Sequence, residues 1–222
     1  MAINLQKGQT IDLRKNAQGE SVYDLSSVTI GLGWDVRKKS GGFFSKLFSA
    51  EEAEFDLDAI AFLLDSNGKV ANLGYTKKQP NGQDMGLFGG DIVFFNSMQH
   101  PSGHIWLTGD NRTGAGDGDD EQIIVKLDSL EERYQKILFV VTIYQGIKLK
   151  QDFSMLDNAF VRAVDARGKE ITKFSLSGDA SLNNMCTMVF AEAYRKDGNW
   201  KFRALGEPHP TDSFVEILKK HI

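Results

Sequence analysis

The chain has 222 residues, of which 41% are hydrophobic, so it is long enough to bury a core as one large or two small domains. Its formal net charge is −4 at pH 7, and it has no long run of lysine and arginine that could neutralise a row of phosphates. These values argue against a nucleic-acid partner. The first residues lack a basic stretch followed by an apolar one, and the longest apolar run, ILFVVTIY, is too short to span a membrane. We therefore expect a soluble cytoplasmic protein, with peripheral membrane contact left open.

Short apolar runs rich in Val, Ile, Phe and Thr dominate the chain. In chain order they are VTIGLGW (28–34), DAIAFLLD (58–65), DIVFFN (91–96), HIWLTG (104–109), EQIIVKL (121–127), ILFVVTIY (137–144), NAFVRAVD (158–165), KEITKFSL (169–176), TMVFAEAYR (187–195) and WKFRALG (200–206). Between them, the Asn-Gly, Arg-Gly and Asp-Gly steps of DSNGK, PNGQ, DARGK and KDGN suit tight turns with positive φ. About ten such strands with little helix predict an all-β fold, an antiparallel two-sheet β-sandwich.

Two segments carry helical signals instead. DSLEERYQKI (128–137) offers Ser129 as an N-cap with Glu132 three residues later. TDSFVEILKKHI (211–222) places Phe214, Ile217 and Leu218 on one face, with lysines in its last turn. We expect a short helix in each segment, the second one packed on a sheet at the C-terminus.

An internal similarity bears on the domain organisation. DAIAFLLDSNGKV from Asp58 and NAFVRAVDARGKE from Asn158 match at a separation of 100 residues, including Asp65 with Asp165. The chain has no Pro/Ser-rich linker, so we predict one domain over 1–222. Two related β-meanders, about 1–127 and 137–222, would form it by packing face to face; chance similarity of two hairpins is the alternative.

The single cysteine has no partner for an internal disulfide. Cys186 lies in NNMCTMVF, which indicates a buried strand thiol rather than a nucleophile.

The most unusual stretch is TGDNRTGAGDGDDEQ (108–122). Its five carboxylates and one arginine carry a net charge of −4, equal to that of the whole chain. Carboxylates this close repel one another unless a cation or water offsets the repulsion. The interspersed glycines let the backbone curl, so that carbonyl and carboxylate oxygens converge. Convergent oxygen ligands favour Ca²⁺ over Mg²⁺, and the alternative is a solvated acidic turn.

The acidic segment is not an EF-hand. Asp110 and Glu121 have the spacing of the first and last ligands of such a loop, but Arg112 and Gly114 stand where further ligands belong, and strands flank the segment. A second acidic pair lies in EFDLDAIAF, where the period of two puts Asp56 and Asp58 on one face of a strand start. If the two segments meet, they can hold about two Ca²⁺ ions; a solvent-facing strand end is the alternative for the pair.

Enzymatic interpretations are weaker. Paired aspartates with a metal could form a phosphohydrolase, but the sequence lacks the alternating helices of the α/β folds that usually carry one. His100 and His104 have HxxxH spacing, yet Pro101 and Gly103 prevent a helix there, so we expect a surface turn rather than a zinc site. GAGDGDD lacks the lysine of a phosphate-binding loop.

These motifs together resemble the TerD-type tellurite-resistance and stress-response family, from about Ile3 to Phe202. The resemblance rests on VTIGLGWDVR, FDLDAIAFLLDSNGKV, DIVFFNS, LTGDNRTGAGDGDDEQIIVKLDSL and FSMLDNAFVRAVD. It implies a calcium-binding β-sandwich without enzymatic activity that acts with other proteins of a stress-resistance module near the cytoplasmic face of the bacterial membrane. The implied ligands are Asp56, Asp58, Asp110, Asn111, Asp117, Asp119, Asp120 and Glu121, with backbone oxygens from Gly114 and its neighbours. A metal-dependent phosphohydrolase or a nucleotide-binding protein using the Asp-rich loop is the alternative.

One segment departs from the family pattern. KKSGGFFSKLFSAEEAE (38–54) is longer than we expect for the simplest members. A surface insertion that folds its aromatic side chains onto the sandwich is the simpler interpretation. The alternative is peripheral contact with an anionic membrane or a partner through Phe43, Phe44 and Phe48 beside the lysines.

Overall fold

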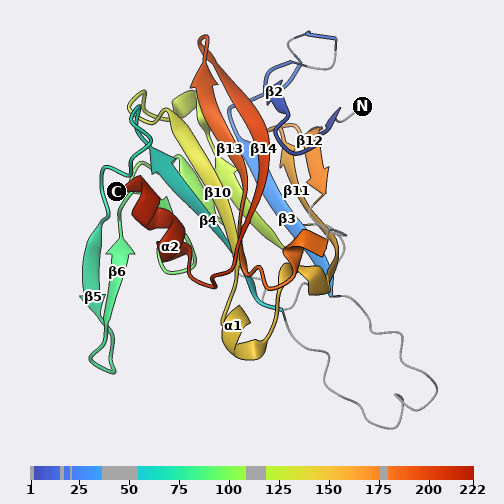
Figure 1. The fold of residues 1–222 in the computed structure, drawn as a ribbon. Helices are drawn as coiled ribbons and strands as arrows, with labels where there is room; N and C mark the ends of the chain where they lie inside the picture. Colours follow the sequence, from blue (N-terminus) through green and yellow to red (C-terminus); the bar gives the residue numbers. More distant parts are fainter. Residues whose placement is uncertain (1–2, 16–17, 21, 37–54, 109–118, 176–179) are drawn as a thin grey trace, which may run out of the picture.

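A computed structural model describes residues 3–15, 18–20, 22–36, 55–108, 119–175 and 180–222, with only the backbone of Val36 and Ala180. Two six-stranded sheets pack face to face, a two-stranded hairpin projects from one side, and a short helix near the C-terminus lies against one sheet (Figure 1). This arrangement is the predicted two-sheet β-sandwich.

The elements follow one another closely along the chain. The strands are β1 (Ile3–Asn4), β2 (Thr10–Asp12), β3 (Val28–Val36), β4 (Leu57–Leu64), β5 (Tyr75–Lys78), β6 (Asp84–Phe88), β7 (Ile92–Val93), β8 (Ile105–Leu107), β9 (Glu121–Val125), β10 (Lys136–Ile143), β11 (Leu156–Val164), β12 (Glu170–Ser175), β13 (Thr187–Lys196) and β14 (Asn199–His209). The helices are α1 (Gly146–Leu149) and α2 (Phe214–Leu218), with 3₁₀ turns η2 (Leu127–Ser129), η3 (Phe153–Met155), η4 (Ala180–Leu182) and η5 (Lys219–His221). No described helix is long and apolar enough to cross a membrane.

The sheets differ in their strand order. Sheet A runs β1-β12-β11-β3-β9-β8 and sheet B runs β2-β14-β13-β10-β4-β7. The pairs are antiparallel except for β1 with β12. Every apolar run predicted as a strand overlaps one, whereas β1, β2, β5 and β6 carry too little apolar pattern to be predicted.

The buried apolar side chains form two clusters, one between the sheets and one on the outer face of sheet B, which explains why β4 is apolar on both faces. Alternate residues of β4, such as Leu57 and Leu63, join the cluster between the sheets. The intervening Ile60 and Phe62 face outward and pack with Phe214 of α2 in a second cluster. Each such buried side chain contributes on the order of 1.5–3 kcal/mol. The C-terminal helix predicted from TDSFVEILKKHI is therefore confirmed, and it covers the outer face of sheet B.

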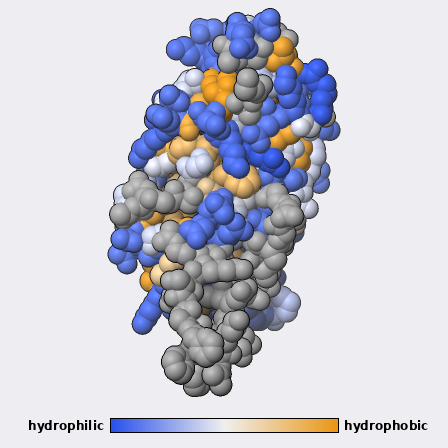
Figure 2. Space-filling model, turned by 90° about the vertical axis from the view of Figure 1, so that its right-hand side faces the viewer, coloured by the Kyte–Doolittle hydropathy of each residue, from blue (hydrophilic) through white to orange (hydrophobic). Residues whose placement is uncertain are grey.

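The outer face of sheet A is different. Seen from that side, the surface of the described residues is mainly hydrophilic, with small apolar patches between the polar side chains (Figure 2). Polar residues at alternate positions of β9 and β11, such as Gln122 and Arg162, produce this face, because their neighbours Ile123 and Val161 point into the core.

The helix predicted over 128–137 is wrong. The chain forms only the turn η2 and then enters β10 at Lys136. Arg195 explains the difference, because its guanidinium donates to the carbonyls of Leu130 (2.7 Å) and Tyr134 (3.1 Å). A contact with a strand distant in sequence thus takes carbonyl groups that a helix would use, and the helical capping signal is overridden.

The two matching segments form the same local structure. Asp65 Oδ1 accepts the backbone N–H groups of Asn67 (2.8 Å) and Lys69 (2.9 Å) after β4. Asp165 Oδ1 accepts those of Arg167 (3.0 Å) and Lys169 (2.8 Å) after β11. Because β4 lies in sheet B and β11 in sheet A, the two turns are equivalent positions in the two layers.

The halves themselves do not form separate layers. Sheet A combines β1, β3, β8 and β9 with β11 and β12, and sheet B combines β2, β4 and β7 with β10, β13 and β14. Strands from 1–127 and from 137–222 thus interleave in both sheets. The division into two related meanders stays a prediction.

Candidate metal site

The acidic segment connects two neighbouring strands at the edge of sheet A. Thr108 follows β8, and its backbone N–H donates to the carbonyl of Gln122 in β9 at 3.0 Å. Of the nine predicted ligands, the structure describes Asp56, Asp58, Asp119, Asp120 and Glu121. Asp110, Asn111, Gly114 and Asp117 lie outside the described residues, as does the insertion with Phe43, Phe44 and Phe48.

Glu121 joins the acidic segment to the other sheet. It is the first residue of β9 and pairs with Leu32, so its side chain points into the sandwich, where it is 2% exposed. Its Oε2 accepts the backbone N–H of Ala59 in β4 at 2.5 Å. The predicted meeting of the GDDE and DLD segments is therefore present at this contact, one residue from Asp58.

Asp58 lies on the opposite side of β4 from the interior. Its neighbours Leu57 and Ala59 belong to the cluster between the sheets, whereas Asp58 shares the outer face with Ile60. It is 6% exposed and sits across from Thr142 of β10. Asp56 precedes the strand, and its carbonyl accepts the N–H of Tyr144 (2.8 Å). The structure thus places the acidic pair at the start of β4, where the sequence predicted it.

Asp120 is held close to β3. Its backbone N–H donates to the carbonyl of Leu32 (2.8 Å), and its Oδ2 accepts the N–H of Trp34 (2.9 Å). Burial raises the pKa of Asp120; the Trp34 hydrogen bond opposes this rise, and the carboxylates of Asp35 and Asp119 add to it. The site therefore disfavours the charged form of Asp120 when no cation is bound.

Asp119 makes a different set of contacts. Its carboxylate, 2% exposed, accepts the Nε–H of Arg162 (2.7 Å) and lies near the amide of Gln122 (3.3 Å). Arg162 also reaches Glu170 (3.3 Å). The carboxylate sits over Gly31, where an added Cβ would lie 2.2 Å from Asp119 Cγ, so only glycine fits at that position.

The sequence analysis did not identify Gly31 and Arg162 as part of this site. A glycine inside the run VTIGLGW is a signal for close approach by another group, but nothing in the sequence says which group approaches. Arg162 comes from β11, and its place beside Asp119 depends on the pairing of β11 with β3.

The described carboxylates do not share one face, since Asp58 lies on the outer face of sheet B and Glu121 and Asp119 lie on opposite faces of sheet A. Gly31, Gln122 and Arg162 are paired neighbours on its outer face, so Asp119 lies outside, whereas Glu121 points inward. Among the described residues, no group of three or more His, Cys, Asp or Glu side chains is close enough to hold a metal ion. A complete site would need ligands from 109–118. The predicted ligands all offer oxygen atoms, which is the ligand type that Ca²⁺ prefers.

The predicted HPSGH turn is present, with an unexpected interior role for His100. Its Nε2 lies 3.2 Å from Asp91 Oδ1, which also accepts the hydroxyl of Tyr134 (2.7 Å). All three side chains are buried. Burial opposes ionisation of Asp91, but the hydrogen bonds from His100 and Tyr134 outweigh it and lower the pKa of this carboxyl. Sequence reasoning missed this buried network, which ties three loops together.

Cys186 is buried, as predicted. Its Sγ donates to the carbonyl of Gln151 at 3.2 Å, and burial raises its pKa to about 11. At neutral pH the thiol stays protonated, which makes it a poor nucleophile.

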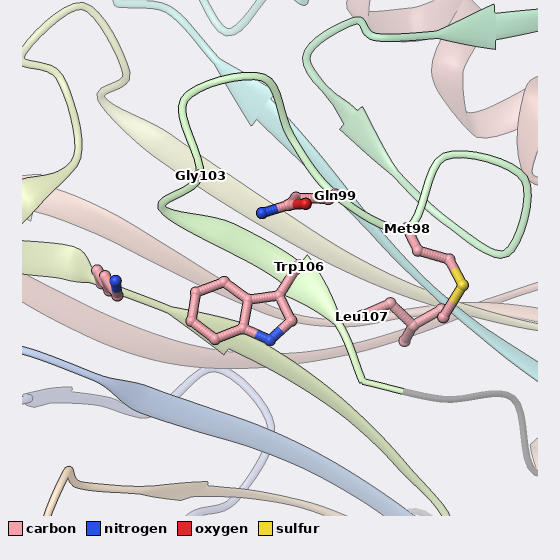
Figure 3. Close-up of a pocket in the computed structure, with 6 residues that line it drawn as sticks. Met98, Gln99, Gly103, Trp106 and Leu107 are labelled. Atoms are coloured by element: carbon pink, nitrogen blue, oxygen red, sulfur yellow. The ribbon is translucent and has the colours of Figure 1, made fainter.

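A surface hollow of about 370 Å³ lies beside β8, close to the start of the acidic segment (Figure 3). Met98, Gln99, Gly103, Trp106 and Leu107 line it together with Lys126. The Lys126 ammonium lies 5.5 Å from the centre of the Trp106 ring, a cation–π contact. Lys126 is the one charged residue among the described residues that line the hollow, so the lining offers no acid–base pair for catalysis.

The fold and this edge define a β-sandwich protein with an acidic connection between two neighbouring strands of one sheet. The family model described as the TerD domain matches residues 1–76 and 82–221, so the chain belongs to the TerD family.

Named relatives agree with this membership. The chain is 54% identical over 222 residues to the tellurium resistance protein TerX of Serratia marcescens, covering 100% of both chains. It is 37% identical over 223 residues to the stress response protein SCP2 of Bacillus subtilis, again covering 100% of both. A crystal structure of a homologue of telluride resistance protein TerD from Streptomyces coelicolor shares the fold, with a TM-score of 0.59 and 19% identity over 89% of this chain and 98% of that one.

Proposed function

We propose that this protein is a calcium-binding, non-enzymatic interaction module of a bacterial stress or tellurite-resistance system. Relatives named for tellurium resistance and for stress response support the resistance role. The observation that carries the calcium proposal is the Glu121–Ala59 contact, because it brings the two acidic segments of the chain to one place between the sheets.

The residues that would hold calcium are the nine predicted ligands, of which Asp56, Asp58, Asp119, Asp120 and Glu121 have described positions. A bound cation would offset the mutual repulsion and the burial of these carboxylates. The separation of Asp119 from Glu121 by sheet A supports about two ions rather than one, since one ion has a ligand distance of only about 2.3–2.6 Å.

The module's partners would be other proteins of the resistance system, at the cytoplasmic face of the membrane. Calcium would act by neutralising carboxylates at the edge of sheet A, which changes the surface offered to a partner. The names of the relatives describe resistance and stress response, not a reaction, which supports a module without catalysis.

The interaction role is tested by affinity capture from a bacterial lysate at buffered free calcium. We expect a set of partners captured with calcium and lost with chelator. Glu121→Gln and Asp58→Asn should lose the same partners, and Glu132→Gln, an exposed site away from the acidic segment, should retain them. Capture that is identical with and without calcium would contradict the proposal.

The non-enzymatic part is tested with the purified protein and a generic phosphomonoester in the presence of Ca²⁺, Mg²⁺ or Mn²⁺. We expect no metal-dependent turnover. Turnover that Asp120→Asn abolishes would identify the protein as a metal-dependent hydrolase instead.

A further inference from the structure

A small cleft lies on the far side of the molecule from sheet A, between the outer face of sheet B and the C-terminal α2–η5 segment. Its volume is about 200 Å³. Its charged and titratable walls include Lys136 of β10, Glu192 of β13, Arg203 and His209 of β14, and Lys220 of η5. Strands far apart in sequence and the last turn of the chain thus bring these groups together.

The buried carboxylate of the cleft already has its counter-ions. Glu192 is 3% exposed; its Oε2 pairs with Lys136 Nζ at 2.7 Å and its Oε1 with Arg203 Nη2 at 2.5 Å. Lys220 brings a third cation, and the other carboxylate on the wall, Glu207, is exposed. The cleft therefore has more positive than negative charge, in a chain whose net charge is −4.

Two side chains that line this cleft each have a nitrogen atom that is buried without a hydrogen-bond partner among the described residues. These atoms are Arg203 Nε and His209 Nε2. Burial lowers the pKa of His209, the Lys220 ammonium lowers it further, and Glu207 opposes both effects. Buried polar nitrogens beside surplus positive charge suit a ligand that brings acceptor oxygens and negative charge.

We propose that this cleft binds a small oxyanion of the phosphate class, held by the Arg203 guanidinium, the His209 imidazole and the Lys220 ammonium. The volume is below the range of about 300–1,000 Å³ that is usual for drug-sized ligands, so it suits a single phosphate group rather than a nucleotide. This site is separate from the proposed calcium site and does not depend on it.

The test is a titration of the calcium-free protein with inorganic phosphate, monitored by NMR of the His209 imidazole and of the backbone amides of β14 and Lys220. We expect saturable shifts at His209 and Lys220. Lys220→Gln should weaken binding about tenfold or more, as the loss of a charge-assisted hydrogen bond implies. Arg203→Lys keeps a cation beside Glu192 but removes the planar guanidinium, and it should weaken binding similarly.

Lys219→Gln is the matched control. Lys219 lies next in the chain to Lys220 but pairs with Glu216 at 2.6 Å and does not line the cleft, so this variant loses the same charge and should bind phosphate unchanged. Vesicles that contain phosphatidate, tested for competition with free phosphate, show whether a lipid headgroup also fits. Absence of saturation, equal shifts with chloride at matched ionic strength, or equal weakening by the Lys219 and Lys220 variants would overturn the proposal.

Discussion

Asp119 and Arg162 show how a single ion pair bears on the calcium proposal. The guanidinium of Arg162 holds the buried Asp119 carboxylate against the outer face of sheet A. If calcium uses Asp119, the ion and the guanidinium compete for the same oxygens. Glu170, which Arg162 also contacts, offers the guanidinium a second acceptor in that case.

Arg162→Gln separates a ligand role of Asp119 from a structural one. Without calcium, we expect this variant to lose about 1–3 kcal/mol of unfolding free energy, because a buried carboxylate loses its counter-ion. With saturating calcium the loss should be smaller, since the ion replaces the guanidinium. Denaturant unfolding in both conditions measures this.

The control is Lys78→Gln, which removes an exposed pair with Asp84 and should change the unfolding free energy little in either condition. Equal losses for Arg162→Gln with and without calcium would mean that Asp119 has a structural role only.

Tyr134→Phe tests the buried network around Asp91. Removing the hydroxyl that donates to Asp91 at 2.7 Å should cost about 1–3 kcal/mol at neutral pH. The folded-state pKa of Asp91 is lowered, so its stabilising contribution is complete above its unfolded pKa of about 3.9 and disappears as pH falls through the folded value. The difference between the two proteins should therefore shrink below about pH 4. A difference that does not change with pH would show that Asp91 is not the group stabilised by Tyr134.

At the scale of elements, the apolar runs predicted most of the strands because the positions that these strands bury are the apolar positions of the sequence. β9 alternates buried and half-buried residues, and β4 is buried on both faces because α2 covers it. β5 is exposed throughout, so its pairing with β6 leaves no apolar pattern to read. The helix expected over 128–137 failed because Arg195, from a distant strand, binds its carbonyls.

The related turns after β4 and β11 provide a matched pair of substitutions. Asp165 has a fully buried side chain that also accepts the N–H of Asp24 (3.1 Å) and pairs with Arg167, whereas Asp65 holds only its own turn in the contacts shown by the structure. Asp165→Asn should cost about 1–3 kcal/mol, and Asp65→Asn clearly less. Thermal unfolding of both variants measures this, and equal costs would contradict the importance of the added contacts.

The candidate site was only partly predictable for the same reason that the helix was not. Residue type and spacing predict oxygen ligands in two segments, and the Glu121–Ala59 contact brings those segments together. The division of Asp119 and Glu121 between the two faces of sheet A depends on the register of β9 with β3, which no local pattern reveals. The partners Gly31 and Arg162 follow from that same register.

At the scale of the whole molecule, the acidic segment lies where an edge of sheet A reaches β4 of sheet B. A cation bound there would link the two sheets, so calcium should raise the temperature of global unfolding. The free energy of unfolding should rise by about 2.7 kcal/mol when the free calcium concentration is a hundred times Kd. Glu121→Gln should reduce the shift, because it weakens the contact between sheets as well as the ligand set.

This calcium shift should depend on pH. The pKa of Asp120 is raised by burial, with Asp35 and Asp119 adding to the rise, so protons compete with calcium at a higher pH than for an ordinary aspartate. Without calcium, a raised folded pKa means that the charged form costs stability above that pKa, and this cost disappears as pH falls through it. The calcium-induced shift in melting temperature should therefore decrease steadily from neutral pH toward the carboxylate range. A shift of constant size over that interval would show that no carboxylate with a raised pKa takes part.

The most direct test of the central claim is a count of bound calcium by equilibrium dialysis, on the native protein and on Asp58→Asn and Glu121→Gln. The account predicts saturable binding of about two Ca²⁺ ions per chain, weaker binding of Mg²⁺, and a loss of bound calcium in both variants. Absence of saturable calcium binding, or the same amount bound by all three proteins, would contradict it.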